Sequence, residues 1–233
     1  MKQLEILYEG KAKKVFKTDD VQKYIVEYKD DATAFNGQKK GSIIGKGVIN
    51  NKISSILFSM IEEKGVPTHF EKYISEREQM VKAVEIVPLE VIIRNYAAGS
   101  ISKRLGIQEG VTFAEPILEF CYKNDAYDDP IINEYHIKAM KLATEEEVTS
   151  IKDYTFRINE ILKEFFLEKG IRLVDFKLEF GRYEENIILA DEISPDTCRL
   201  WDIATNQKLD KDRFRRDLGQ VEEAYKEVLQ RLE

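Results

Sequence analysis

Charged and apolar side chains alternate along the segment from Leu173 to Gly181. In a strand, this spacing puts Asp175, Lys177 and Glu179 on one face. The opposite face then holds Val174, Phe176, Leu178 and Phe180. Two carboxylates beside an ammonium group suit a divalent cation and phosphate oxygens, because Mg²⁺ takes few protein carboxylates and completes its shell with phosphate and water. The segment predicts a site for Mg²⁺ and phosphate on one face of a strand.

A second apolar run, Ile187 to Ala190, follows a polar turn and ends in the acids Asp191 and Glu192. Two apolar runs joined by such a turn predict a β-hairpin. The alternative to a metal site is a half-exposed hairpin whose charges face water, which is normal in an antiparallel sheet. The adjacent acids at the end of the second strand favour the metal site.

Lysines surround a glycine turn near the start of the chain, in the run Gly10-Lys11-Ala12-Lys13-Lys14. Glycine lets a turn approach a nucleotide closely, and lysine can meet its phosphates. The P-loop pattern GxxxxGK[ST] is absent. Taken alone, a solvated turn whose lysines protect an edge strand is the simpler interpretation.

Arg94 ends an apolar stretch and is followed by small residues up to Ser100. Backbone N–H groups, the serine hydroxyl and the guanidinium group can converge on a phosphate at such a place. A strand, a turn and a helix with a serine cap explain the same residues equally well.

The segment from Ser194 to Asp202 follows the acidic pair directly and can bring Asp196 and Arg199 into the same cleft. A plain Pro-Asp turn is the alternative. Further on, Arg215 stands in a charged segment that is most simply a helix start or a turn, although its side chain can reach a phosphate.

Strands and helices must position these clusters. The expected strands are 4–8, 14–16, 24–28, 84–94, 172–180 and 187–190, and the expected helices are 49–61, 151–166 and 221–232. Because strands and helices do not alternate strictly, the pattern favours an α+β fold over a doubly wound one. Pro88 interrupts the stretch 84–94, and proline cannot donate to a ladder, so we expect a strand break or hinge there and a lobe boundary close by.

Composition narrows the class of protein. The 233 residues include 36 Lys and Arg and 43 Asp and Glu, a net charge of −7, which argues against general binding to nucleic acid or anionic membranes. No apolar run approaches the roughly 20 residues that span a bilayer, and the start lacks the apolar stretch of a signal peptide. Two cysteines are too few for a disulfide framework, which fits a reducing cytoplasm. The chain is predicted to be a cytoplasmic globular protein.

The cysteines and histidines offer little chemistry of their own. Cys198 has no histidine near it in the sequence, so it is interpreted as a buried thiol rather than a nucleophile. His69 and His136 stand alone and are expected at the surface or in packing contacts, and no zinc site can be assembled from their spacing with cysteine.

Taken together, the clusters resemble one known family. The stretches Ile86 to Ser100 and Leu173 to Gly181 both match signature segments of phosphoribosylaminoimidazole-succinocarboxamide synthase, or SAICAR synthetase. Further matches occur in order along the chain: Tyr8 to Lys13, Lys123 to Asp125, Asp128 to Pro130, and Asp191 to Asp196. The resemblance covers essentially the whole chain.

The resemblance implies ligation of L-aspartate to the carboxylate of carboxyaminoimidazole ribotide (CAIR), driven by ATP and Mg²⁺, in purine biosynthesis. It implies an α+β fold of two lobes similar to the ATP-grasp and kinase arrangements, with antiparallel sheets and flanking helices. A mainly β lobe, 1–86, would cover ATP, and an α+β lobe, 87–233, would carry the metal and substrate sites. The small-molecule partners would be CAIR and L-aspartate, and a homodimer is possible.

The resemblance also implies roles for sixteen residues. Gly10, Lys11, Ala12 and Lys13 would cover the phosphates, and Lys82 with the backbone of Ile86 would hold adenine. Glu179 and Asp191 would bind the metal, and Lys13 and Lys177 would be catalytic. The ribotide site would be lined by Arg94, Ser100, Lys123, Asp129, Lys177, Asp196, Arg199 and Arg215.

One position departs from the pattern, because some family members have an acid where this chain has Asn36.

Two other functions would require similar sequence features. A kinase-like phosphotransferase also needs a glycine hairpin and metal carboxylates, but the catalytic-loop pattern HRDxxxxN is absent. A nucleotide-sensing module would bind without turnover. Analysis of the products formed from ATP, aspartate and the ribotide separates the three.

Overall fold

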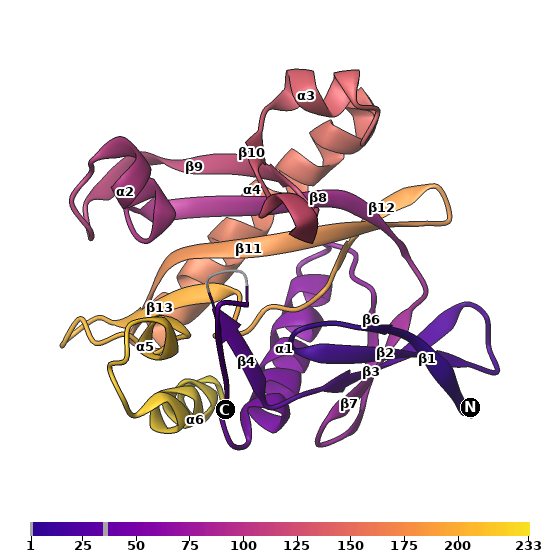
Figure 1. Ribbon diagram of the computed structural model, residues 1–233, viewed down its shortest axis with the longest axis horizontal. Coiled ribbons are helices and arrows are strands. Elements are labelled where there is room, and N and C mark those ends of the chain that lie inside the picture. The colour runs from indigo at the N-terminus through magenta and orange to yellow at the C-terminus, as the bar shows by residue number, and fades with distance from the viewer. Residues whose placement is uncertain (1, 35–36) are drawn as a thin grey trace.

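The protein is described by a computed structural model that covers residues 2–34 and 37–233, so Asn36 lies outside the described residues. Two larger antiparallel sheets and several helices make up this part of the chain. In Figure 1 the N-terminal sheet lies at the lower right and the second sheet runs across the upper half, with helix α1 below it. The predicted α+β class with antiparallel sheets and flanking helices is confirmed.

The N-terminal sheet has five strands in the order β1-β2-β3-β7-β6. Their bounds are β1 Gln3–Glu9, β2 Lys13–Thr18, β3 Lys23–Tyr28, β6 Phe70–Ser75 and β7 Glu78–Lys82. A separate hairpin consists of β4 Asp31–Ala34 and β5 Lys39–Ser42. The three predicted N-terminal strands are therefore present, and β6 and β7 are additions that their mixed polar sequences did not indicate.

The second sheet has the order β10-β9-β8-β11-β12, and β13 pairs with the first half of β11 on the same side as β12. The bounds are β8 Glu85–Tyr96, β9 Thr112–Tyr122, β10 Ile131–Ile132, β11 Ile171–Tyr183, β12 Asn186–Ala190 and β13 Cys198–Asp202. Strand β11 is the centre of this sheet because β8 pairs along its other side. The predicted hairpin of β11 and β12 is present.

The helices are α1 Lys46–Glu63, α2 Ser100–Leu105, α3 Glu134–Ala139, α4 Glu145–Glu168, α5 Asp212–Arg215 and α6 Val221–Leu232, with a 3₁₀ turn, η1, at Asp125–Tyr127. Helix α4 begins with a capping box, in which the Thr144 hydroxyl accepts from the Glu147 N–H and the Glu147 carboxylate accepts from the Thr144 N–H. Among the described residues, no helix is both long and apolar enough to cross a membrane.

One hydrophobic core holds the second sheet and the long helices together. Ile53 and Leu57 from α1, Leu162 from α4, Val91 from β8 and Phe180 from β11 are completely buried in it. Helix α1 therefore packs into this core although it lies between β5 and β6 in the sequence. The strands change sheet between β7 and β8, and we propose a lobe boundary near residue 86, with α1 docked on the second lobe.

The strand break expected at Pro88 is not present. Strand β8 continues through Pro88, and its pairing with β11 shifts register between Glu179 and Gly181. The carbonyl of Pro88 accepts a hydrogen bond from the Lys123 N–H at 3.1 Å. A bulge accommodates the missing proline N–H, so the strand need not end there.

The expected position of Val174 on the same apolar face as Phe176 is also wrong. Val174 packs with Ala98 and Trp201 in a small separate cluster, whereas Leu173 joins Phe176 in the main core. The pairing of β11 with β13 is irregular between Leu173 and Asp175. Such an irregularity breaks the strict alternation of side chains that the prediction assumed.

The Asp30 carboxylate connects the N-terminal sheet to the start of α1. It accepts two hydrogen bonds from Arg77, at 2.8 and 2.9 Å, and others from the N–H groups of Gly47 and Gly45, at 2.9 and 3.2 Å. A Cβ on Gly47 would lie 2.5 Å from the carbonyl oxygen of Tyr28, so this approach requires glycine. Hydrogen bonding to Arg77 is the main reason that the pKa of Asp30 falls to about 2. Burial raises this pKa, and the hydrogen bonds from the two backbone N–H groups lower it further.

The variant Asp30→Asn is expected to lower the free energy of unfolding at pH 7 by about 1 kcal/mol, the scale of a partly exposed ion pair, because it removes the charge that pairs with Arg77. Because the folded-state pKa lies below the unfolded one, this stabilisation is complete above about pH 4 and disappears as the pH falls toward 2. Urea unfolding should therefore show the wild type losing more stability than Asp30→Asn between pH 4 and pH 2. The neighbouring, more exposed Asp31→Asn is the control, and equal losses in wild type and Asp30→Asn would contradict the assignment.

Candidate active site

A cleft of about 1030 Å³ opens between the two sheets. Strands from both sheets line it, together with the loops that follow β9 and β12. All sixteen predicted site residues contribute to its wall: Gly10, Lys11, Ala12, Lys13, Lys82, Ile86, Arg94, Ser100, Lys123, Asp129, Lys177, Glu179, Asp191, Asp196, Arg199 and Arg215. Residues as far apart in the sequence as Gly10 and Arg215 are thus brought to one place.

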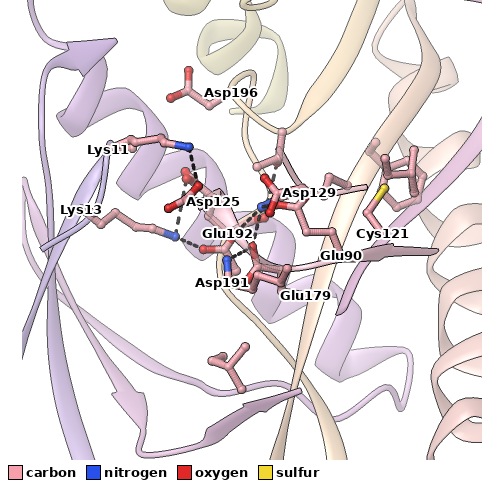
Figure 2. Close-up of a pocket in the computed structure, with 18 of the residues that line it drawn as sticks. Lys11, Lys13, Glu90, Cys121, Asp125, Asp129, Glu179, Asp191, Glu192 and Asp196 are labelled. Atoms are coloured by element: carbon pink, nitrogen blue, oxygen red, sulfur yellow. Dashed lines mark hydrogen bonds and ion pairs between the residues drawn. The ribbon is translucent and has the colours of Figure 1, made fainter. Parts of the chain in front are cut away.

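The hairpin between β1 and β2 points two lysines into this cleft. The turn is closed by a hydrogen bond from the Gly10 N–H to the Lys13 carbonyl at 2.8 Å. The ammonium group of Lys11 lies 2.8 Å from Asp125, and that of Lys13 bonds to Asp191 (Figure 2). Both contacts join the N-terminal sheet to segments that follow strands of the second sheet, since Asp125 lies in η1 after β9 and Asp191 follows β12.

Lys177 lies at the centre of a group of carboxylates. Its Nζ is 2.5 Å from Glu179 Oε1, 3.2 Å from Glu90 Oε1 and 3.3 Å from Asp191 Oδ2. Lys123 also donates to Glu179 Oε1, at 2.9 Å. The predicted face of β11 is confirmed in this respect, because Asp175, Lys177 and Glu179 all line the cleft.

The charges in this group shift one another's pKa values. Burial opposes the ionised form of Asp191, but Lys13 and Lys177 outweigh it and hold the pKa of Asp191 far below its usual range. Burial likewise disfavours the charged form of Lys177, but Glu179, Asp191 and Glu90 raise its pKa well above the usual value. The pKa of Lys13 is raised for the same reason, against burial, by Asp191 and Glu192. These groups stay charged throughout the neutral range.

The donor set fits Mg²⁺ only as a partner of phosphate. Among residues 2–34 and 37–233, no three His, Cys, Asp or Glu side chains converge to form a metal cage. Glu179 on β11 and Asp191 after β12 offer hard oxygen atoms from neighbouring strands, and both now contact ammonium groups. Two carboxylates with the remaining ligands from phosphate and water are a usual shell for Mg²⁺.

The Arg94 guanidinium is almost completely buried at one end of the cleft. It donates to Asp175 at 2.8 Å, to Glu119 at 2.7 Å and to the Ser100 hydroxyl at 3.1 Å. Arg94 and Asp175 face each other across the β8–β11 ladder. The predicted meeting of Arg94 with Ser100 is therefore present.

Two further arginines extend this network. Arg199 on β13 donates to Asp175 at 2.9 and 3.0 Å and to Asp212 at 3.0 Å, and Arg215 on α5 donates to Asp212 at 2.6 Å. Gly99 has a φ of +62°, and a Cβ there would lie 2.3 Å from the Arg199 guanidinium. Glycine at this position thus lets the Arg199 side chain lie against the backbone before Ser100.

Asp196 is more enclosed than a typical substrate-binding residue. Its two carboxylate oxygens accept from Lys46 at 2.7 Å and from the Tyr225 hydroxyl at 2.5 Å, and its side chain is only 3% exposed. Burial opposes its ionisation, but Lys211 and Lys46 lower the pKa of Asp196. Its position in the cleft wall is as predicted, and its contact with substrate stays a prediction.

Several charged residues at the site were not among the sixteen predicted ones. Lys46 on α1 and Lys211 before α5 both contact Asp196, and Glu90 on β8 contacts Lys177. Glu90 stands four residues before Arg94, so its even spacing in the same strand was a usable signal. No local sequence pattern distinguishes Lys46 or Lys211, whose side chains are largely buried, from the lysines at the surface.

The histidines and cysteines behave as structural groups. His69 is buried against Phe58 with ring centroids 5.2 Å apart, and burial followed by Lys13 lowers the pKa of His69 to about 3. His136 forms a capping box at the start of α3. The predicted buried thiol at Cys198 is confirmed, and Cys121 is buried at the cleft wall.

Known proteins resemble this chain over nearly its whole length. A profile of the SAICAR synthetase family matches residues 6–232. The phosphoribosylaminoimidazole-succinocarboxamide synthase of Caldanaerobacter subterraneus subsp. tengcongensis is 67% identical over 233 residues, which is 100% of this chain and 99% of the relative. That of Coprothermobacter proteolyticus is 64% identical over 233 residues, with the same coverage.

Solved structures agree with these sequences. The synthase of the same name from Ehrlichia chaffeensis superposes with a TM-score of 0.96 at 50% identity and covers 98% of each chain. A type-2 SAICAR synthetase in complex with ADP superposes with a TM-score of 0.95 at 50% identity, over 98% of this chain and 97% of the other.

The two-sheet α+β fold, its charged cleft and these relatives define an enzyme of the ligase class. More narrowly, the chain belongs to the SAICAR synthetase family.

Neither cysteine is expected to react readily in the folded protein. Burial, followed by Glu90 and Glu119, raises the pKa of the Cys121 thiol to about 12, and burial raises the pKa of Cys198 further. Since the thiolate is the reactive form, alkylation by iodoacetamide at pH 8 should be at least about a hundredfold slower in the native protein than in urea. Mass spectrometry of timed samples measures this for each cysteine. Modification of Cys121 or Cys198 at the unfolded rate would show that a reactive thiol was overlooked.

Proposed function

We propose that this enzyme uses ATP to join L-aspartate to the carboxylate of CAIR, giving SAICAR, ADP and phosphate in cytoplasmic purine synthesis. The observation that carries the proposal is that one cleft combines the ammonium–carboxylate group around Lys177 with the arginines near Ser100. The first array suits a nucleoside triphosphate with its metal ion, and the second suits a second anion. An ATP-dependent ligation of an acid to an amine needs the nucleotide site and the site for the second anion close to each other.

The nucleotide would lie between the β1–β2 hairpin and the start of β8. Val15, Val81, Val84 and Ile86 give the cleft an apolar wall beside Lys82, which suits a flat base. The hairpin residues 10–13 would cover the phosphates. The type-2 relative in complex with ADP supports nucleotide binding here, because it shares half of its residues with this chain.

Glu179 and Asp191 would hold Mg²⁺ on the nucleotide phosphates. When bound, the metal ion would neutralise phosphate charge and polarise the γ-phosphoryl group. Lys13 and Lys177 now pair with these carboxylates and would be free to turn toward the phosphates once a divalent cation takes their place. Both lysines would then stabilise charge on the γ-phosphoryl group, which is the catalytic role we propose.

The ribotide would occupy the arginine end of the cleft. Its phosphate would bind Arg94, Ser100, Arg199 and Arg215, which already form one connected network through Asp175 and Asp212. Lys123, Asp129 and Asp196 would line the remainder of the ribotide site.

The proposed reaction passes through an acyl phosphate, because a carboxylate is a poor electrophile. A carboxylate oxygen of CAIR attacks the γ-phosphorus and ADP leaves. The aspartate amine then attacks the acyl carbon, and the C–O bond breaks with its electron pair leaving on phosphate. The oxygen between carbon and phosphorus therefore departs with the phosphate.

The test combines product analysis with isotope labelling. ATP, aspartate and CAIR labelled with ¹⁸O in its carboxylate are expected to give SAICAR, ADP and phosphate that carries one labelled oxygen. Chelation of Mg²⁺ should abolish the reaction. A phosphorylated acceptor would indicate the kinase-like alternative, and binding without turnover a sensing module. Unlabelled phosphate, or AMP with pyrophosphate, would contradict the acyl phosphate.

Arg215 and Arg216 form a matched pair for testing the ribotide site. Arg215 lines the cleft, whereas the neighbouring Arg216 pairs with Glu109 and does not. A hydrogen bond to a charged group contributes about 1.5–3 kcal/mol, so Arg215→Gln should raise the KM for CAIR at least about tenfold and leave the KM for ATP within about twofold. Arg216→Gln should resemble the wild type in steady-state kinetics. If Arg215→Gln changed only the KM for ATP, Arg215 would belong to the nucleotide site instead of the ribotide site.

A further inference from the structure

Lys211 differs from the other cations of the cleft in donating no side-chain hydrogen bond within residues 2–34 and 37–233, although it lies near one carboxylate. Among the lysines and arginines that line the cleft, it alone donates no side-chain hydrogen bond to any described residue. Its nearest carboxylate oxygen, Asp196 Oδ2, is 3.6 Å away. Its side chain is only 13% exposed, and it faces the cleft.

The carboxylate beside Lys211 already has its partners. Asp196 accepts from Lys46 at 2.7 Å and from the Tyr225 hydroxyl at 2.5 Å. One carboxylate thus stands between two lysines, and it holds Lys46 much closer than Lys211. In the part of the chain that the structure describes, the Lys211 ammonium group has no hydrogen-bonded counter-ion, and its side chain is mostly shielded from water, where the charged form is costly.

The charged groups around Lys211 act in both directions. Burial is the largest influence and lowers the pKa of Lys211. The positive charges of Lys46 on α1 and Arg215 on α5 lower this pKa as well. The negative charges of Asp196 and, more weakly, Glu192 raise it. The net effect is a lowered pKa. A larger share of this amine is therefore neutral near pH 7 than of an ordinary lysine, and a neutral amine can take up a proton.

The proposed reaction needs such a group. Free aspartate carries an ammonium group at neutral pH, and an ammonium nitrogen has no electron pair with which to attack. We propose that Lys211 is the proton acceptor for the aspartate amine, an inference that rests on the proposed function. Nζ of Lys211 takes one proton from the aspartate ammonium group, and the freed electron pair forms the bond to the acyl carbon. The departing phosphate takes the second proton as the C–O bond breaks, which leaves a neutral amide.

Other side chains of the cleft fit this role less well. Glu179 and Asp191 are bonded to lysines and are expected to bind the metal. His69, whose pKa is about 3, is too weak a base to hold a proton at neutral pH. Asp196 is engaged at both oxygens, yet it stands where it stabilises the ammonium form of Lys211 once the proton has arrived.

Lys211→Arg tests the inference, because arginine keeps the positive charge but stays protonated at all working pH values. A positioned base contributes about 10²–10⁴-fold, so kcat/KM for aspartate should fall at least about a hundredfold at pH 7. The constants for ATP and CAIR should stay near those of the wild type. Lys208→Arg is the control, since Lys208 lies three residues earlier, pairs with Glu109 and stands outside this cleft.

The pH dependence separates proton transfer from a structural role. In the wild type, kcat/KM for aspartate should level off above the pKa of Lys211, whereas in Lys211→Arg it should keep rising as free aspartate loses its own proton. A wild-type rate in Lys211→Arg, or a loss by the same factor at every pH, would overturn the inference. Failure of the wild type to form the amide would instead overturn the proposed function.

Discussion

The register between β8 and β11 is the constraint on which the site depends. It sets Arg94 opposite Asp175 and Glu90 opposite Glu179, so that the charged side chains of both strands share the face toward the cleft. Because side chains alternate along a strand, a shift of one residue would turn this face into the core and bring apolar side chains into the cleft. The bulge around Pro88 lies beyond these pairs and leaves their register intact.

This register also creates an electrostatic problem that the other elements solve. Two glutamates face each other at Glu90 and Glu179, which is unfavourable for like charges in neighbouring strands. Lys177 lies between them, and Lys123 adds a second cation from the loop after β9. The same positive groups are the ones that a bound polyphosphate would attract, and in the free protein the carboxylates of Glu90, Glu179 and Asp191 compensate their charge.

Contacts between distant segments hold the two sides of the cleft together. Lys13 of the N-terminal sheet bonds to Asp191, and Lys46 of α1 bonds to Asp196 in a nearly inaccessible pair. Asp30 joins the same helix to the N-terminal sheet through the backbone of its first turn. Removing one member of a buried pair leaves an uncompensated charge, so these contacts constrain the relative position of the two walls of the cleft.

Local sequence patterns were sufficient to predict many of the strands and many of the charged residues that line the cleft. Alternation from Leu173 to Gly181 predicted that Asp175, Lys177 and Glu179 share a face, and the signature segments indicated the family and the residues that line one cleft. The sequence did not indicate that Val174 leaves the main core, that β8 continues through Pro88, or that Lys46 and Lys211 meet at Asp196. Lys46 and Asp196 are 150 positions apart, and such a contact exists only after α1 has docked on the second sheet. Spacing along the chain reports which side chains share a strand or helix face, whereas burial and charge pairing across elements arise only from the packing of those faces against each other.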